Sequence, residues 1–196
     1  MRRTPVAPIK TRGARSNHTN LPGSECEPAG HGIGRSRGGL TTKIHSAVDG
    51  HGRPLASVVT GGQRNDGAML EAVLADIHAP RRGRGRPRSR PDAVIADRAY
   101  SNGPLRRALR RRRITAVIPE KRDTIAARAR RGSAGGRPPA FDAGLYKGRN
   151  VIERSFALAK QWRGLATRYD KHAIIYRAAV TLCAILTWLR TLGDTP

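Results

Sequence analysis

Hydrophobic and polar residues first alternate along positions 40–48, the period expected of a strand with one buried face. The next six residues, DGHGRP, have turn chemistry, and positions 55–60 form a second β-branched run. These segments predict an antiparallel hairpin with Lys43 and His45 on one face of it.

From Asp66 the pattern becomes helical, and Asp66 is placed to cap the helix N-terminus. A short apolar run then ends at Asp97, and it is followed by a helix up to position 112 and a further strand at 114–118. This strand, crossover and strand have the length that parallel pairing needs, so we expect an α/β fold. Ligands of open α/β sheets bind at the carboxyl ends of such strands, where Asp97 stands, although a turn or cap residue is the structural alternative.

The segment YKGRNVIERSFALAK, residues 146–160, is predicted to form one helix. At 100° per residue, one narrow stripe of that helix carries Tyr146, Arg149, Glu153 and Lys160. An apolar stripe beside it carries Leu145, Ile152, Phe156 and Ala159. The polar stripe would border the core and face a cleft; the alternative is a solvated surface with an Arg149–Glu153 ion pair.

The remaining segments set the domain organisation. Residues 1–30 are rich in Pro, Gly, Ser, Asn and Arg without any period, so we expect a disordered basic arm there and one domain over 31–196. Residues 81–90 are expected to be an exposed arginine linker, and 172–192 a buried closing helix, because that segment is apolar on nearly every face.

Charge narrows the choice of partner. Lys and Arg number 38 against 14 acidic residues, a net charge of +24, which favours a polyanion and above all nucleic acid. A membrane is the rival, but no uninterrupted apolar run reaches the roughly 18 residues of a spanning helix, and no signal peptide is visible. Cys26 and Cys183 lack the spacing of a zinc site. We therefore expect a cytoplasmic, nucleoid-associated protein without a membrane partner.

Two acids suit phosphodiester chemistry, because Asp97 and Glu153 each lie on a core element beside basic residues. Carboxylates of this kind hold pairs of Mg²⁺ (or Mn²⁺) ions that activate an attacking oxygen and stabilise the leaving oxygen. Arg149 and Lys160 would then bind phosphates of the DNA strand.

Several stretches together resemble the DDE-class transposases of bacterial insertion sequences: GRSRGGLTTKIH, VTGGQRND, VIADRAY, GSAGGRPPAFD, YKGRNVIERSF and ATRYDKHAIIYRA. The resemblance covers about residues 31–192 and implies a ribonuclease-H-like mixed sheet flanked by helices. It also implies that Asp97 and Glu153 are catalytic and metal-binding. The implied DNA-binding residues are Tyr146, Arg149, Lys160, Lys43, Arg35 and Arg37. The implied activity is cleavage of element ends and their transfer to target DNA.

The chain departs from that family at its first catalytic Asp, which belongs on the first strand, upstream of GRSRGG. Glu25, Glu27 and Asp49 are poor substitutes, because the first two lie in a coil-like segment and the third in a hairpin turn. We therefore expect a fold that lacks its first strand, in a degenerate remnant or the downstream half of a frame-shifted gene. A homodimer or a partner chain would supply the strand, and a non-catalytic basic nucleic-acid-binding protein is the alternative function.

Overall fold

The structure is a computed structural model that describes residues 3–13, 30–81 and 83–193. Its strands are β1 (Arg3–Gly13), β2 (Gly34–Ser36), β3 (Gly39–Val48), β4 (Pro54–Gly61), β5 (Ala93–Ala96), β6 (Thr115–Val117) and β7 (Thr167–Arg168). Its α-helices are α1 (Asp66–Ala75), α2 (Gly103–Arg111), α3 (Arg122–Arg130), α4 (Ala143–Lys147), α5 (Asn150–Lys160), α6 (Arg163–Ala166) and α7 (Ala173–Gly193). Two 3-10 turns, η1 (Arg98–Tyr100) and η2 (Gly132–Gly135), complete the set.

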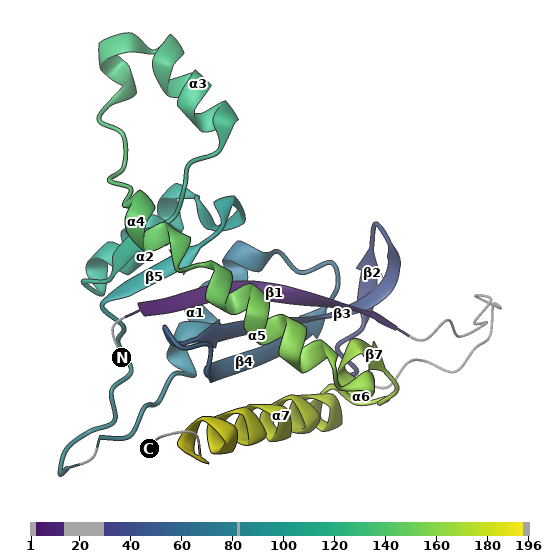
Figure 1. The fold of residues 1–196 in the computed structure, drawn as a ribbon. Helices are drawn as coiled ribbons and strands as arrows, with labels where there is room; N and C mark the ends of the chain where they lie inside the picture. Colours follow the sequence, from purple (N-terminus) through teal and green to yellow (C-terminus); the bar gives the residue numbers. More distant parts are fainter. Residues whose placement is uncertain (1–2, 14–29, 82, 194–196) are drawn as a thin grey trace.

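One 7-stranded mixed sheet organises the molecule, in the order β2-β3-β1-β5-β6, with β4 on β3 and β7 on β1. β3 runs antiparallel to both β1 and β4, whereas β5 runs parallel to β1 and to β6. The expected hairpin is therefore confirmed as β3–β4, and the expected parallel crossover is confirmed as β5-α2-β6 (Figure 1).

Strand β1 corrects two expectations. Residues 3–13 form the strand at the centre of the sheet and are not part of a disordered arm, while residues 14–29 lie outside the described residues. The sheet has no gap between β3 and β5, because β1 pairs with β3 from Val6 to Arg12 and with β5 from Arg3 to Val6. Two prolines, Pro5 and Pro8, hid this strand from the sequence pattern, because proline cannot donate a ladder hydrogen bond and is rare in central strands.

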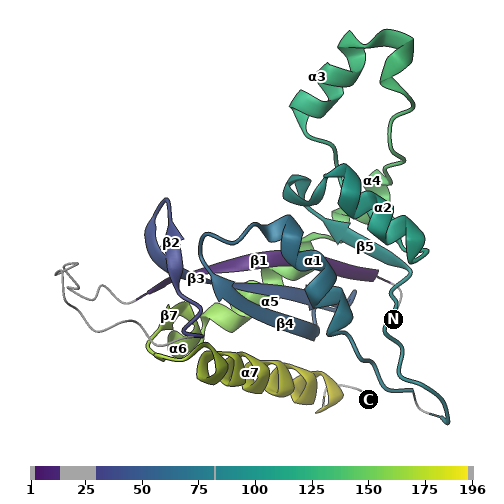
Figure 2. The same cartoon turned by 180° about the vertical axis from the view of Figure 1, so that it is seen from behind.

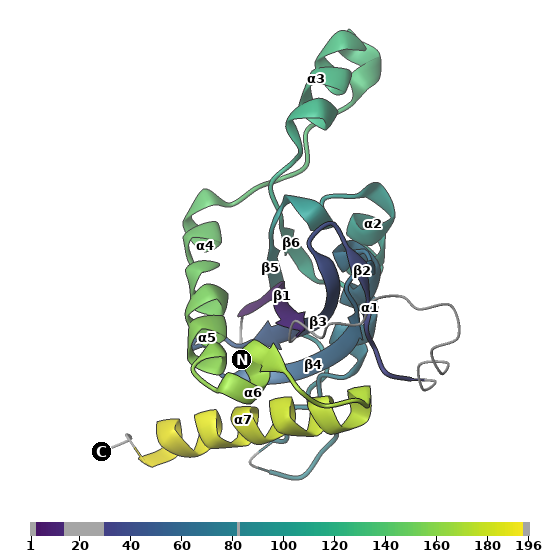
Figure 3. The same cartoon turned by 90° about the vertical axis from the view of Figure 1, so that its right-hand side faces the viewer.

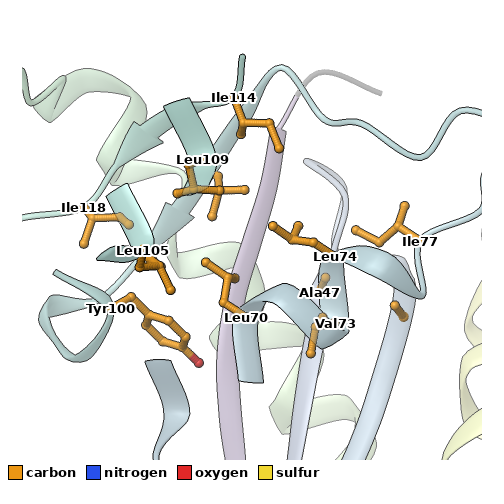
Figure 4. Packing of buried hydrophobic residues seen from close by; sticks show 13 residues of the cluster. Ala47, Leu70, Val73, Leu74, Ile77, Tyr100, Leu105, Leu109, Ile114 and Ile118 are labelled. Atoms are coloured by element: carbon orange, nitrogen blue, oxygen red, sulfur yellow. The ribbon is translucent and has the colours of Figure 1, made fainter. Parts of the chain in front are cut away.

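Helices cover the two faces of the sheet unequally. α1 and α2 lie on one face, and α4, α5 and α7 lie on the other (Figure 3). The α1 face holds the larger core, in which Leu70 and Leu74 of α1 and Ile77, just after that helix, meet Leu105 and Leu109 of α2 over the sheet (Figure 4). The opposite face is divided into three smaller clusters, around Ile44, Val48 and Ile95.

Two segments project from this body. Residues 121–142, with α3, extend beyond β5 and β6, and α3 has no buried residue (Figure 1). A bidentate ion pair between Arg128 and Glu120 ties α3 to the strand end at 2.6 Å. The arginine linker, residues 81–90, forms a separate projection between α1 and β5, at the lower right of Figure 2. It is more ordered than expected, since Ala79 and Arg88 exchange backbone hydrogen bonds of 2.9 and 2.8 Å.

Helix α7 is not the buried closing helix that was expected. Tyr176, Val180 and Cys183 pack into the cluster around Ile44, but the opposite side of the helix is exposed. A helix that is apolar on all sides does not reveal in its sequence which side will be covered. By length and composition alone, residues 173–192 would suffice to cross a membrane. A core helix of a soluble protein can meet the same two criteria.

Candidate active site on the α5 face of the sheet

Asp97 lies directly after β5, on the face that carries α4 and α5. Ile95 packs against Leu145 and Tyr146 on that face, whereas Ala96 packs into the α1 core. The backbone of Asp97 is still extended, with φ −78° and ψ −179°, so strand alternation places it on the same face as Ile95. Its Oδ1 accepts a hydrogen bond of 2.9 Å from the Ala99 N–H. The structural alternative, a turn cap, is therefore realised here, and among the described residues the Asp97 Oδ2 accepts no hydrogen bond.

Glu153 lies in the first turn of α5, which crosses β1 and β3 on that same face (Figure 1). Its Oε1 accepts a hydrogen bond of 2.6 Å from Arg149, and the side chains are 56% and 25% exposed. The Arg149 Nε is buried and has no partner among the described residues. The i, i+4 pair considered from sequence is thus present, at a position from which the carboxylate still faces solvent.

The expected single helix over 146–160 is broken. α4 ends at Lys147 and α5 begins at Asn150, and between them Gly148 and Arg149 donate to carbonyls three residues back. Such bonds tighten the helix, so the 100° extrapolation from Tyr146 to Glu153 fails across this turn. Tyr146 turns toward the β5–β6 core, with its ring 5.2 Å from that of Phe141.

The apolar stripe of this segment behaves as expected. Leu145, Ile152, Phe156 and Ala159 all pack against clusters of the sheet. Lys160 is exposed at the last turn of α5. The structure therefore brings Arg149 and Glu153 together, keeps Lys160 at the surface and packs Tyr146 against the β5–β6 cluster.

The register of β1 identifies the position beside Asp97. Val6 pairs with Ala96 in the parallel ladder, so position 7 is level with Asp97. In the antiparallel ladder Ala7 pairs with Ser46. Position 7 thus lies between Asp97 and Ser46 in the sheet, and the residue there is alanine. No residue of β1 is acidic.

Two carboxylates alone do not make a complete set for two metal ions. Among the described residues no group of three or more His, Cys, Asp or Glu side chains could hold a metal ion. Asp49 is unavailable, because its buried carboxylate accepts bonds from the N–H groups of His51 and Arg53 and from the Arg53 side chain. Glu25 and Glu27 lie outside the described residues.

The basic residues expected to contact DNA are placed differently from one another. Arg35 and Arg37, in and after β2, are exposed. Lys43 is 7% exposed on the α1 face, where its ammonium group contacts Asp66 at 2.8 Å and the Arg64 carbonyl at 2.7 Å. This placement argues against DNA contact by Lys43, because binding a phosphate would first require breaking a buried ion pair.

Asp66 and Arg168 hold elements of the fold together through contacts that were not expected from the sequence. Asp66 does not cap α1; the Asn65 side chain does so by accepting from the Gly67 N–H at 2.9 Å, and Asp66 holds Lys43 instead. Arg168 is buried, donates 2.6 Å to Thr42 and contacts the His31 carbonyl, and it stacks 5.2 Å from the Tyr176 ring centroid. It thereby ties the segment before β2 to α7. Its place in the stretch ATRYDKHAIIYRA is the sequence signal that could have pointed to it.

A cavity at the β3–β4 turn is separate from the candidate carboxylates. This cavity, of about 840 Å³, is lined by Asp49, Arg53 and Trp188 among others, and includes neither Asp97 nor Glu153. Glu153 is 56% exposed and Asp97 is half-buried, so both carboxylates reach solvent outside this cavity, which suits a long polymer better than an enclosed small ligand.

Comparison with known proteins identifies the family of the chain. The family described as "Transposase DDE domain" matches residues 8–188. The "Putative transposase for insertion sequence element IS402" of Burkholderia cepacia is 38% identical over 149 residues, which are 75% of this chain and 63% of that protein. The "Putative transposase for insertion sequence element IS6501" of Brucella ovis is 31% identical over 151 residues, 77% of this chain and 100% of that protein. The chain therefore belongs to the DDE transposase family of bacterial insertion sequences.

Proposed function

We propose that this chain is a ribonuclease-H-like DDE domain that binds the DNA of an insertion sequence and its target, and that is catalytically incomplete as it stands. The observation that carries the proposal is the register of β1, which puts an alanine between Asp97 and Ser46. The strand order β4-β3-β1-β5-β6, with β1 central and parallel to β5, supports the fold.

Asp97 and Glu153 are the two carboxylates that would hold divalent metal in this proposal. Both belong to elements on one face of the sheet, and each has one oxygen outside the bonds described above. Bound Mg²⁺ or Mn²⁺ would supply activation of an attacking oxygen and stabilisation of the leaving oxygen. A complete set needs a further carboxylate, so the residues present fit only part of a two-metal site and support no cleavage step by themselves.

DNA binding would rest on exposed cations of several elements. Arg35, Arg37 and Lys160 are exposed, as are most arginines of the 81–90 segment and of α3. With a net charge of +24, each phosphate neutralised releases counterions, so log affinity should fall against log salt by about 0.9 per contact. Binding that is flat between low and moderate salt would contradict a phosphate-driven interface.

The decisive experiment restores the carboxylate. Ala7→Asp should bind Mn²⁺ more tightly than the unaltered chain in calorimetry and should nick supercoiled plasmid in Mn²⁺, whereas the unaltered chain should not. Ala7→Asn is the matched control, because it has the same shape without the charge. Asp97→Ala in the Ala7→Asp background should abolish nicking.

Two outcomes would contradict the proposal. Nicking by the unaltered chain that depends on Asp97 would mean that another acid completes the site. A folded Ala7→Asp variant, judged by circular dichroism, whose metal affinity equals that of Ala7→Asn would mean that position 7 is not beside the metal site. In that case salt-dependent duplex binding alone would favour the non-catalytic DNA-binding function.

A further inference from the structure

The cavity at the β3–β4 turn contains a fixed pair of stacked side chains. The Arg53 guanidinium lies 4.3 Å from the centroid of the Trp188 ring. Asp49 holds that guanidinium, because its Oδ2 accepts 2.7 Å from Nε and lies 2.6 Å from a terminal nitrogen. The Trp188 indole N–H donates 2.7 Å to the Pro54 carbonyl. Both members of the stack are therefore held in place before any ligand arrives.

This stack joins α7 to the β3–β4 turn, yet the space beside it stays open. Close packing is the rule where side chains serve stability alone. The cavity measures about 840 Å³, within the range of about 300–1,000 Å³ that is typical of sites for small ligands. Leu55, Ile77 and Ala79 add apolar surface to its wall. The cavity therefore has the size and the lining of a binding site.

The lining favours a planar ring. A nucleobase stacks well on an aromatic ring or on the plane of an arginine. Because the Arg53 charge is already paired with the buried Asp49 carboxylate, this part of the wall offers a plane and not a free charge. His51 and His78 are exposed and also line the cavity, and their ring nitrogens can form hydrogen bonds with the polar edge of a base.

Charge at the rim identifies the class of ligand. Pro80 lines the cavity, and the arginine linker, residues 81–90, begins at the next residue. Arg88 pairs through its backbone with Ala79, another lining residue, so the linker returns to the cavity. A phosphate attached to the bound base would lie in the field of these arginines. An aromatic side chain of a protein would fit the stack equally well but would bring no negative charge to them.

The cavity is distinct from the candidate active site. Ser46 is level with position 7 and with Asp97, and Asp49 lies three residues after Ser46 in the chain. At about 3.3 Å per residue, this separates the two places by about 10 Å along the sheet. A paired base is enclosed in the double helix, so a base can enter the cavity only when it is unpaired.

We propose that this cavity binds one unpaired nucleotide of a DNA strand. The base lies against the Arg53–Trp188 stack, and its phosphate lies toward the arginines of the linker. The site rests on the DNA binding proposed above and not on the catalytic state of the chain. It would let the protein distinguish DNA that carries an unpaired base from a continuous duplex.

Fluorescence anisotropy of labelled duplexes tests the site on the full chain. Three duplexes of one sequence carry at their centre an unpaired adenine nucleotide, an unpaired abasic nucleotide or no extra nucleotide. At about 0.15 M salt the chain should bind the adenine duplex about tenfold more tightly than the other two. The abasic duplex controls for the flexibility that an extra nucleotide introduces. Trp188→Leu should reduce this preference to less than about threefold.

Two further variants separate stacking from charge and from folding. Arg53→Lys keeps the positive charge but lacks the planar guanidinium, so it should also lose most of the preference. Trp162→Leu makes the matched change at an exposed tryptophan outside the cavity and should keep the preference.

The Trp162→Leu variant also provides a direct reporter, because Trp162 and Trp188 are the only tryptophans of the chain. In this variant the emission of Trp188 should fall on binding the adenine duplex and stay unchanged on binding the abasic duplex. This measurement needs no change inside the cavity, so it remains decisive even where Trp188→Leu fails to fold.

The outcomes that overturn the proposal differ from those that overturn DNA binding. Equal affinity for the three duplexes would show that the cavity takes no unpaired base, while the proposed DNA binding would stand. A Trp188→Leu variant that is folded by circular dichroism and keeps the full preference would place the base elsewhere. Free dAMP that changes Trp188 emission at lower concentration than the adenine duplex would assign the cavity to free nucleotides. Binding to none of the duplexes would refute the proposed DNA binding and this site with it.

Discussion

The two faces of the sheet differ in how completely they are closed. On the α1 face, Leu70, Val73 and Leu74 are almost wholly buried, and they join α2 and the sheet in one continuous cluster. On the α5 face three smaller clusters share the area, large apolar side chains of α5 and α7 remain exposed, and the candidate carboxylates lie at the margin. The comparison indicates that one face supplies most of the stability and leaves the other free to present binding surfaces.

The largest test of that contrast deletes the same atoms on each face. Leu74→Ala, at 1% exposure, should lower the free energy of unfolding by about 2–5 kcal/mol, because it leaves a cavity in the continuous cluster. Leu158→Ala, on the exposed side of α5, should lower it by less than about 1 kcal/mol. Urea unfolding followed by circular dichroism measures both. Equal losses would mean that the two faces contribute alike.

Acid should weaken the α1 face selectively through His45. Burial lowers the pKa of His45 from 6.5 to about 4; the attraction of Asp66 offsets part of this, and Lys43 adds to the lowering. Because the unfolded chain binds the proton first, this contribution to stability is complete above pH 6.5 and is lost as the pH falls toward 4. The loss should reach about 3 kcal/mol.

His45→Gln removes that titration. The variant should lose less stability than the unaltered chain between pH 6.5 and 4, as measured by urea midpoints at each pH. Parallel curves for the two proteins would show that His45 is not neutral when folded, despite its 2.8 Å hydrogen bond with Thr60.

Replacing the prolines of β1, the strand between the two faces, should increase the stability of the fold. Replacing Pro5 or Pro8 by Val supplies a backbone N–H in a central strand and should stabilise the fold by up to about 1 kcal/mol for each hydrogen bond gained. Pro104→Ala is the control, because Pro104 lies at the start of α2, where its missing N–H has no helical partner to lose. A gain in thermal stability at Pro104 but at neither β1 position would contradict this account.

The smallest effect is expected on the open face. Glu153→Gln breaks only an exposed ion pair with Arg149, so the free energy of unfolding should change by less than about 0.5 kcal/mol. Asp49→Asn removes the same charge from a buried carboxylate with several donors and should cost distinctly more. Thermal denaturation compares the two, and a larger loss at Glu153 would make its role structural.

Sequence predicted the parts of the fold whose signals are local. The β3–β4 hairpin, α1 and the β5-α2-β6 crossover each carry their own hydrophobic period, so their existence could be read directly. β1 could not, because Pro5 and Pro8 contradict strand propensity and its partners β3 and β5 come from distant parts of the chain. Tertiary pairing overrides local propensity in such a strand.

The candidate site shows the same division. The i, i+4 pair of Arg149 and Glu153 is local and was foreseen, whereas the turn at Gly148 that removes Tyr146 from the stripe was not. The Lys43–Asp66 ion pair joins a strand to a helix start 23 residues later, and no period in the sequence connects the two. That position 7 is the neighbour of Asp97 in the sheet follows only from the pairing register of β1 and β5, which the sequence alone does not reveal.

That register also has a genetic consequence. Every alanine codon differs from an aspartate or a glutamate codon by a single base at its second position. The alanine at position 7 is therefore one point mutation away from a carboxylate beside Asp97. Under the proposed function, a single nucleotide change would therefore restore the missing carboxylate without any rearrangement of the rest of the reading frame.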